Sequence, residues 1–191
     1  MNSVIERILA GFQYILPQHF LSRIVYALMR SEIKWVKNTL ISQITRIVGI
    51  DVNEALSSDP ADYPCFNAWF TRELKPGVRT FDETPQAFLS PCDGRISETG
   101  SLTSNRILQA KGKDYTLEEL LAGDAVCSEL LNGYFSTIYL SPKDYHRIHM
   151  PIDGRLLRMT HVPGKLFSVA PYTARQVPRL FARNERVISI F

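Results

Sequence analysis

The sequence lacks the features that mark a secreted, disulfide-bonded or membrane-spanning protein. Its three cysteines are far apart and form no CxxC pair, so we expect neither a disulfide framework nor a cysteine zinc site, and a reducing compartment fits. The longest early uncharged run, residues 8–22, contains Pro17 and three polar side chains, whereas a spanning helix needs about 20 mostly apolar residues. Because Glu6 and Arg7 interrupt the start, no secretory signal is expected.

Extreme composition, internal repeats and low-complexity tracts are also missing. Hydrophobic residues make up 45% and charged residues 21% of the 191 residues, which excludes a disordered or fibrous chain. The net charge is only +3, but it is unevenly distributed. Lys and Arg outnumber Asp and Glu by six to two in residues 1–50 and by seven to two in residues 151–191, whereas residues 51–100 carry nine acidic and four basic side chains.

Residues 1–50 are predicted to be helical because apolar residues recur at helical spacing, as in Leu21, Ile24, Val25 and Leu28. Pro17 predicts a break between the first two helices, and Gly49 predicts a stop. Apolar stripes with interspersed Arg and Lys suit the surface of an anionic membrane better than nucleic acid. The alternative is that these helices pack on their own domain with a solvated basic side.

The remainder of the sequence predicts strands. Residues 66–74 form a short amphipathic helix, Thr116 and Glu119 form a capping box, and short runs at 94–99, 134–140 and 155–162 are typical of strands. We therefore expect an α+β fold with a helical, membrane-associating region at 1–75 and a β-rich core at 76–191. Residues 186–191 read as a strand that stops without a turn, so we expect this core to be incomplete at its C-terminus.

The densest group of reactive side chains is residues 139–151, where His146 and His149 lie between two prolines. Acid–base chemistry, a structural role and a metal site all remain open for them. His161, Cys92 and Asp93 have no recognisable metal-ligand spacing, so no metal is expected. Asp93, between Cys92 and Gly94, is either a turn carboxylate or a carboxylate that orients a histidine.

Taken together, these segments resemble bacterial phosphatidylserine decarboxylase proenzymes along nearly the whole chain. The resemblance rests on an ordered series of motifs: FNAWFTRELKPGVR at 66–79, SPCDG at 90–94, QAKG at 109–112, DYHRIHMP at 144–151, PGKLFSV at 163–169 and NERV at 184–187. The segment at 144–151 is the most specific of them.

The resemblance implies a self-processing enzyme of phospholipid biosynthesis that converts phosphatidylserine to phosphatidylethanolamine and CO2. In the family, a serine within a Gly-Ser-Thr motif becomes a pyruvoyl group on a small C-terminal subunit, and this group is the electron sink for decarboxylation. The resemblance assigns activation of that serine to Asp93 and His149, and decarboxylation to His146. It also implies peripheral binding at the cytoplasmic face of the bacterial cell membrane. The oligomeric state stays open, with a homodimer as one alternative.

The sequence departs from the family pattern in three places. No Gly-Ser-Thr motif occurs in the 191 residues, so we expect the pyruvoyl-forming serine in a segment beyond Phe191 and no activity from this chain alone. Cys92 replaces the usual alanine, and Ala170 replaces a frequent asparagine. Two other interpretations remain: a non-catalytic, membrane-associated domain of the same fold, and an unrelated metal-dependent hydrolase.

Overall fold

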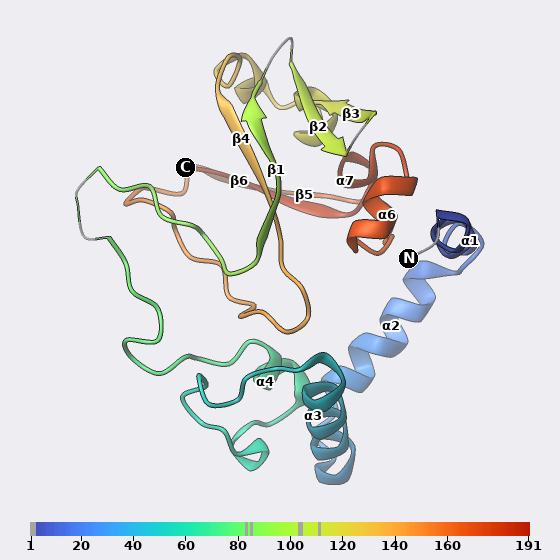
Figure 1. Ribbon diagram of the computed structural model, residues 1–191, viewed down its shortest axis with the longest axis vertical. Helices are drawn as coiled ribbons and strands as arrows, with labels where there is room; N and C mark the ends of the chain where they lie inside the picture. Colours follow the sequence, from blue (N-terminus) through green and yellow to red (C-terminus); the bar gives the residue numbers. More distant parts are fainter. Residues whose placement is uncertain (1–2, 83, 85, 103–104, 111) are drawn as a thin grey trace. The chain divides into compact units, whose positions relative to one another are not determined.

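The computed structural model describes residues 3–82, 84, 86–102, 105–110 and 112–191, which form an α+β fold as predicted (Figure 1). The helices are α1 (Ser3–Phe12), α2 (Gln18–Met29), α3 (Lys34–Val48), α4 (Phe66–Phe70), α5 (Leu117–Leu120), α6 (Pro171–Gln176) and α7 (Leu180–Arg183), with 3-10 turns at Pro60–Asp62 and Ala125–Ser128. The strands are β1 (Arg95–Ser101), β2 (Arg106–Ala110), β3 (Lys113–Thr116), β4 (Tyr134–Tyr139), β5 (Arg158–Val162) and β6 (Arg186–Ile190).

The N-terminal helices confirm the break predicted at Pro17 and the helix stop predicted at Gly49. Pro17 directly precedes α2, and α3 ends at Gly49, whose φ of 75° is left-handed and whose N–H donates to the Thr45 carbonyl. Glycine adopts this conformation at little cost because it has no Cβ. The predicted capping box is also present, since the Thr116 hydroxyl accepts from the Glu119 N–H and the Glu119 carboxylate accepts from the Thr116 N–H.

The chain divides into two compact units. Unit 1 comprises residues 1–21, 96–139 and 155–191, and unit 2 comprises residues 22–95 and 140–154. The chain thus leaves unit 1 within α2 and returns to it at β1. Our boundary at residue 75 marks the expected limit of membrane association, which is a different property and stays a prediction.

Unit 1 contains short paired strands and two apolar clusters. β1 pairs with β4, and β2 with β3 and β5 with β6 are antiparallel. The terminal strand expected at 186–191 is confirmed as β6, which runs in register with β5 from Arg186 opposite Val162 to Ile190 opposite Arg158. The clusters consist of Leu102, Ile107, Tyr115, Leu117 and Cys127, and of Ala10, Phe167, Val177 and Leu180.

A buried amide holds β2 against the segment that contains α6 and α7. The Gln109 side chain donates to the carbonyls of Ala174 and Val177 and accepts from the Leu180 N–H, at 2.6–2.8 Å. All three contacts satisfy backbone groups at the ends of short helices, which would otherwise be costly to bury. Ala170 stands at the N-cap of α6 and offers no side-chain cap.

Unit 2 is built around Ile41, Ile50, Phe66 and Trp69, where α3 packs on α4. The helix predicted at 66–74 is wrong in length, because α4 ends at Phe70. The residues that follow are used in extended pairing instead: Leu56 N–H donates to the Glu73 carbonyl, and Lys75 N–H donates to the Glu54 carbonyl. This pairing fixes the segment that leads to Arg79.

Gly164 is predicted to be indispensable for packing in unit 1. A Cβ there would lie 2.5 Å from the Arg183 carbonyl oxygen and 2.6 Å from the Glu185 nitrogen, whereas a Cβ on Gly11 meets nothing within 4 Å. We expect Gly164→Ala to lower the free energy of unfolding by about 1–3 kcal/mol and Gly11→Ala, inside α1, to leave it unchanged or raise it by up to about 1 kcal/mol. Denaturant unfolding of the full-length protein checks this, and equal midpoints for the two variants would contradict it.

Candidate functional site

Two loops of unit 2 are joined by a pair of backbone hydrogen bonds. Leu89 N–H donates to the Pro151 carbonyl at 2.8 Å, and His149 N–H donates to the Pro91 carbonyl at 2.7 Å. The two loops therefore run in opposite directions. Pro91 and Pro151 have no N–H to return, so the pairing stops at these two bonds. The result is that the loop carrying Asp93 lies beside the loop carrying His149.

These loops line a cavity of about 460 Å³, a size typical of small-molecule sites. Its polar lining includes Arg79, Asp93, Tyr145 and His149, and its apolar walls include Leu74, Pro76, Phe81, Leu89 and Pro91. The structure therefore brings together two of the three residues that the sequence proposed, Asp93 and His149. His146 lies on the same loop as His149 but does not line this cavity.

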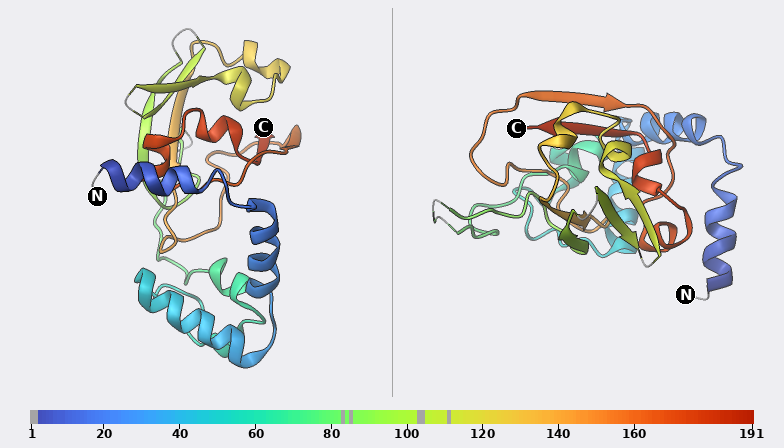
Figure 2. Two further views of the ribbon diagram at one scale, coloured as in Figure 1. Left: turned by 90° about the vertical axis from the view of Figure 1, so that its right-hand side faces the viewer. Right: turned by 90° about the horizontal axis from the view of Figure 1, so that it is seen from above.

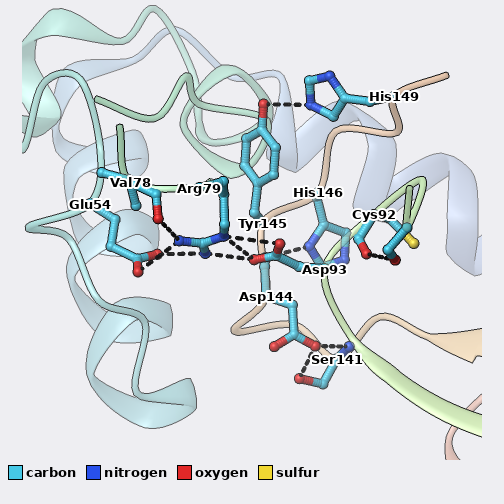
Figure 3. A network of polar contacts seen from close by, with 11 residues as sticks. Glu54, Val78, Arg79, Cys92, Asp93, Ser141, Asp144, Tyr145, His146 and His149 are labelled. Atoms are coloured by element: carbon cyan, nitrogen blue, oxygen red, sulfur yellow. Dashed lines mark hydrogen bonds and ion pairs between the residues drawn. The ribbon is translucent and has the colours of Figure 1, made fainter. Parts of the chain in front are cut away.

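The Asp93 carboxylate is held by Arg79 (Figure 3). Arg79 Nε lies 3.1 Å from Oδ1, and Nη2 lies 2.6 Å from Oδ2. The same guanidinium donates to both oxygens of Glu54 at 3.0 and 2.9 Å. Arg79 is the largest cause of the lowered pKa of Asp93, and both carboxylates raise the pKa of Arg79. Asp93 is therefore an ionised carboxylate at neutral pH.

His149 is in contact with Tyr145 rather than with a carboxylate. His149 Nε2 lies 3.1 Å from the Tyr145 hydroxyl oxygen, and the two rings stack with centroids 5.6 Å apart. Tyr145 is buried, whereas His149 is exposed. Asp93 and His149 thus share a cavity while each has another side-chain partner, and the role of Asp93 in orienting His149 stays a prediction.

His146 has different surroundings, as its place outside a regular helix indicated. Its Nδ1 lies 2.8 Å from the Asp144 carbonyl oxygen, and its ring packs on Phe70 with centroids 4.0 Å apart. A carbonyl oxygen only accepts, so Nδ1 carries the proton and the neutral ring has its lone pair on Nε2. The Asp144 carboxylate in turn accepts from the N–H and hydroxyl of Ser141, which fixes this turn.

The remaining sequence candidates behave as ordinary groups. Burial raises the pKa of the Cys92 thiol, and the charges of Asp93 and Asp144 raise it further, so Cys92 is a neutral thiol and not an activated nucleophile. His161 lies in unit 1, where Nε2 is 3.1 Å from Glu185. Within the described part of the chain, no three His, Cys, Asp or Glu side chains are grouped as a metal ion would require.

Sequence reasoning missed Arg79 and Glu54 as site residues. Arg79 appeared only as the last residue of a motif, and Glu54 was not singled out. They are 25 residues apart, and Asp93 lies 14 residues beyond Arg79. No periodicity connects such positions. The only available signal was the excess of acidic residues in 51–100 around a few arginines, which does not identify partners.

Comparison with known proteins gives a consistent family. Residues 66–191 match the family model for phosphatidylserine decarboxylase, and residues 8–47 match a second model described as PSD. Proteins named phosphatidylserine decarboxylase proenzyme are similar over almost the whole chain. The relative from Alkalilimnicola ehrlichii is 52% identical over 98% of this chain, that from Xanthomonas campestris pv. campestris (strain B100) 50% over 96%, and that from Stutzerimonas stutzeri 49% over 97%. The chain spans 65%, 65% and 63% of their respective lengths.

The contact with Asp144 predicts the tautomer of His146. We expect neutral His146 to carry its proton on Nδ1, because the Asp144 carbonyl at 2.8 Å can only accept. Nitrogen NMR of histidine-labelled full-length protein distinguishes the tautomers, and a His146→Gln variant assigns the signal. A proton found on Nε2 in the neutral form would show that this contact does not hold the ring.

Proposed function

We propose, since this chain belongs to the phosphatidylserine decarboxylase family, that the protein containing it converts phosphatidylserine to phosphatidylethanolamine and CO2. The observation that carries the proposal is the cavity in unit 2, which lies within the matched range and presents Asp93 and His149 together. A carboxylate and an imidazole in one cavity are the groups that activate a serine in other enzymes.

The residues present fit a pyruvoyl group that arises from a serine outside these 191 residues. The cavity of about 460 Å³ has space for a further peptide segment or a headgroup. When bound, the pyruvoyl group supplies the electron sink for decarboxylation. In this proposal the chain contributes the proton-handling groups, and a C-terminal subunit contributes the pyruvoyl group.

The first proposed task of these groups is self-processing. His149 takes the proton of the attacking serine, and Asp93 stabilises the imidazolium that results. Asp93 is suited to this because Arg79 keeps its carboxylate ionised. In the described arrangement His149 Nε2 contacts the Tyr145 hydroxyl, so engagement with the serine requires that the imidazole exchange this partner.

His146 is proposed to act in decarboxylation. Its Nδ1 is committed to the Asp144 carbonyl, which leaves Nε2 as the atom that exchanges a proton or pairs with a carboxylate. The ring is half-buried against Phe70, so its orientation is fixed by packing as well as by the hydrogen bond. Two histidines three residues apart therefore offer separate proton sites for the two steps.

A second part of the proposal is peripheral membrane association, and α1 supports it. Two polar side chains of this region contact the rest of unit 1: Glu6 is buried and accepts from Arg175 at 2.6 Å, and Gln13 accepts from the Ser168 N–H at 2.8 Å. Within unit 1, α1 packs on α6 (Figure 2). Its outward face is apolar and exposed, and consists of Val4, Ile5, Ile8, Leu9 and Phe12.

Helix α2 continues this pattern. It buries none of its residues, and Phe20, Leu21, Ile24, Val25, Tyr26 and Leu28 are exposed. Arg7, Arg23 and Arg30 lie among these apolar residues. An exposed apolar face bordered by cations binds at the interface of an anionic bilayer, in this proposal at the cytoplasmic face of the bacterial membrane. Among the described helices, none combines the length and the hydropathy needed to cross a membrane.

One observation favours the alternative, a non-catalytic membrane-associated domain of the same fold. Asp93 and His149 are each paired with another residue, as they would be if these contacts were purely structural. The two interpretations differ in two measurable properties, since only the enzyme cleaves itself and releases CO2. Homodimer formation is compatible with both.

Self-processing tests the enzymatic proposal. In the full-length protein we expect Asp93→Ala or His149→Ala to block self-cleavage, because the serine then lacks its base or the base lacks its carboxylate. His146→Ala should reduce CO2 release by at least about 100-fold, within the range for loss of a general acid or base, while cleavage proceeds. Gel analysis and release of labelled CO2 measure the two steps. Normal cleavage by Asp93→Ala would remove Asp93 from the mechanism.

Vesicle binding tests the membrane proposal. Replacing Ile8 and Phe12 together by glutamine removes apolar area worth about 1.5–3 kcal/mol per side chain when fully buried. We therefore expect at least about tenfold weaker binding to vesicles of phosphatidylcholine and phosphatidylglycerol. Tyr134→Gln is the matched control, since Tyr134 is a large, 87% exposed side chain on β4. Equal binding by both variants and the wild type would show that α1 is not a membrane-binding helix.

A further inference from the structure

We infer that Arg79, braced by Glu54, is a positioning residue that fixes the orientation and the charge of the Asp93 carboxylate for its work with His149. This inference rests on the proposed function, because it assigns Arg79 a part in self-processing. It extends that function to two residues that touch neither the serine nor the lipid in the proposed mechanism.

The planar guanidinium of Arg79 lies between two carboxylates. Arg79 contacts both oxygens of Asp93 through Nε and Nη2, and both oxygens of Glu54 through Nη1 and Nη2. Bidentate guanidinium–carboxylate pairs restrict the rotation of the carboxylate, which a single point contact does not. The side chains of Arg79, Glu54 and Asp93 are 33%, 34% and 25% exposed, so solvent screens the pairs only in part.

The brace is anchored in the backbone of unit 2. The Glu54 carbonyl accepts from Lys75 N–H at 2.9 Å, and Ala55 forms a bridge with Leu74. Backbone contacts therefore hold Glu54 beside the segment that leads to Arg79, independently of the ion pair between the two side chains. Arg79 transmits this fixed position to Asp93, whose own loop is held by the bond between Pro91 and His149.

The charge balance explains why a second carboxylate is useful. Arg79 and Asp93 alone would form a neutral pair, which stabilises an imidazolium poorly. Glu54 restores a net charge of −1 to the trio while Arg79 still fixes Asp93. A fixed negative charge beside His149 favours the imidazolium that forms when the serine proton is taken. The trio thus combines rigid placement with a remaining negative charge.

Other polar groups near Asp93 include the Tyr145 backbone and His149, which both lower the pKa of Asp93, the neutral Cys92 thiol, and Asp144, whose carboxylate faces Ser141. The charged side chains of Glu73 and Lys75 line the same cavity. Arg79 is the cation that holds the carboxylate ionised. Without it, Asp93 and Glu54 would repel each other, and protonation of one carboxylate would become easier. The acid limb of the cleavage profile should then move to higher pH.

The test measures cleavage of freshly translated full-length protein shifted into buffers from roughly pH 5 to pH 8, the range in which histidine titrates. We expect Arg79→Met to slow cleavage at neutral pH by at least about tenfold and to move the acid limb to higher pH. Arg79→Lys, which keeps the charge but loses the fork, should be slowed with its limb unmoved. The matched control is Arg106→Met, which breaks an exposed pair with Asp114 in unit 1 and should cleave as the wild type does.

A double variant separates positioning from a merely structural role. Because Glu54 becomes a repelling neighbour once Arg79 is absent, Arg79→Met with Glu54→Gln should cleave faster than Arg79→Met alone. Independent structural losses would instead add and make the double variant slower. A wild-type rate and pH profile for Arg79→Met overturns the inference, and so does a double variant slower than Arg79→Met alone. If Arg79→Met shows no cooperative unfolding, Arg79→Lys decides, and a wild-type rate for it overturns the inference.

Asp93→Ala, measured in parallel, distinguishes failure of the proposed function from failure of the role of Arg79. Normal cleavage by Asp93→Ala, or a wild type that never cleaves, removes the proposed function itself. Blocked cleavage by Asp93→Ala together with unaffected cleavage by Arg79→Met removes only the role of Arg79. Blocked cleavage by the first and slowed, pH-shifted cleavage by the second supports both.

Discussion

Two backbone hydrogen bonds, from Leu89 to Pro151 and from His149 to Pro91, determine the candidate site. They bring together two loops that have no regular secondary structure and lie more than fifty residues apart. The prolines that accept these bonds cannot donate in return, so the pairing cannot grow into a sheet. Side chains must supply the rest of the order, and they do so through ion pairs and a histidine–tyrosine contact rather than through a ladder.

Because side chains rather than a sheet order these loops, ion pairs determine the geometry of the site. Where a sheet would fix Asp93 by repeated backbone bonds, here a guanidinium fixes it, and the guanidinium is fixed by a second carboxylate. Such an arrangement responds to pH and to single charge changes more than a ladder does. It also leaves the imidazole of His149 exposed, where it is held by its backbone bond to Pro91 and by its hydrogen bond and ring contact with Tyr145.

Much of the fold was predictable because it follows local rules. The break before α2, the left-handed Gly49, the capping box and β6 each depend on a few neighbouring residues. The length of α4 was not predictable in this way, because residues 73–75 pair with residues 54–56 instead of continuing the helix. The partners of Asp93 were missed for the same reason. Resemblance identified Asp93 and His149, but only the folded chain shows which side chains they contact.

The inward and outward faces of α1 show a related limit of pattern reasoning. A periodic apolar stripe is ordinarily taken to face the core, yet in α1 the buried positions are Glu6 and Ala10, while the larger apolar residues are exposed. Glu6 can be buried because Arg175 pairs with its carboxylate. The net charge of +3 likewise does not show that basic and acidic residues are concentrated in different segments. Six of the chain's 22 basic residues lie in the helical residues 1–50, and its acidic residues include the pair that surrounds Arg79.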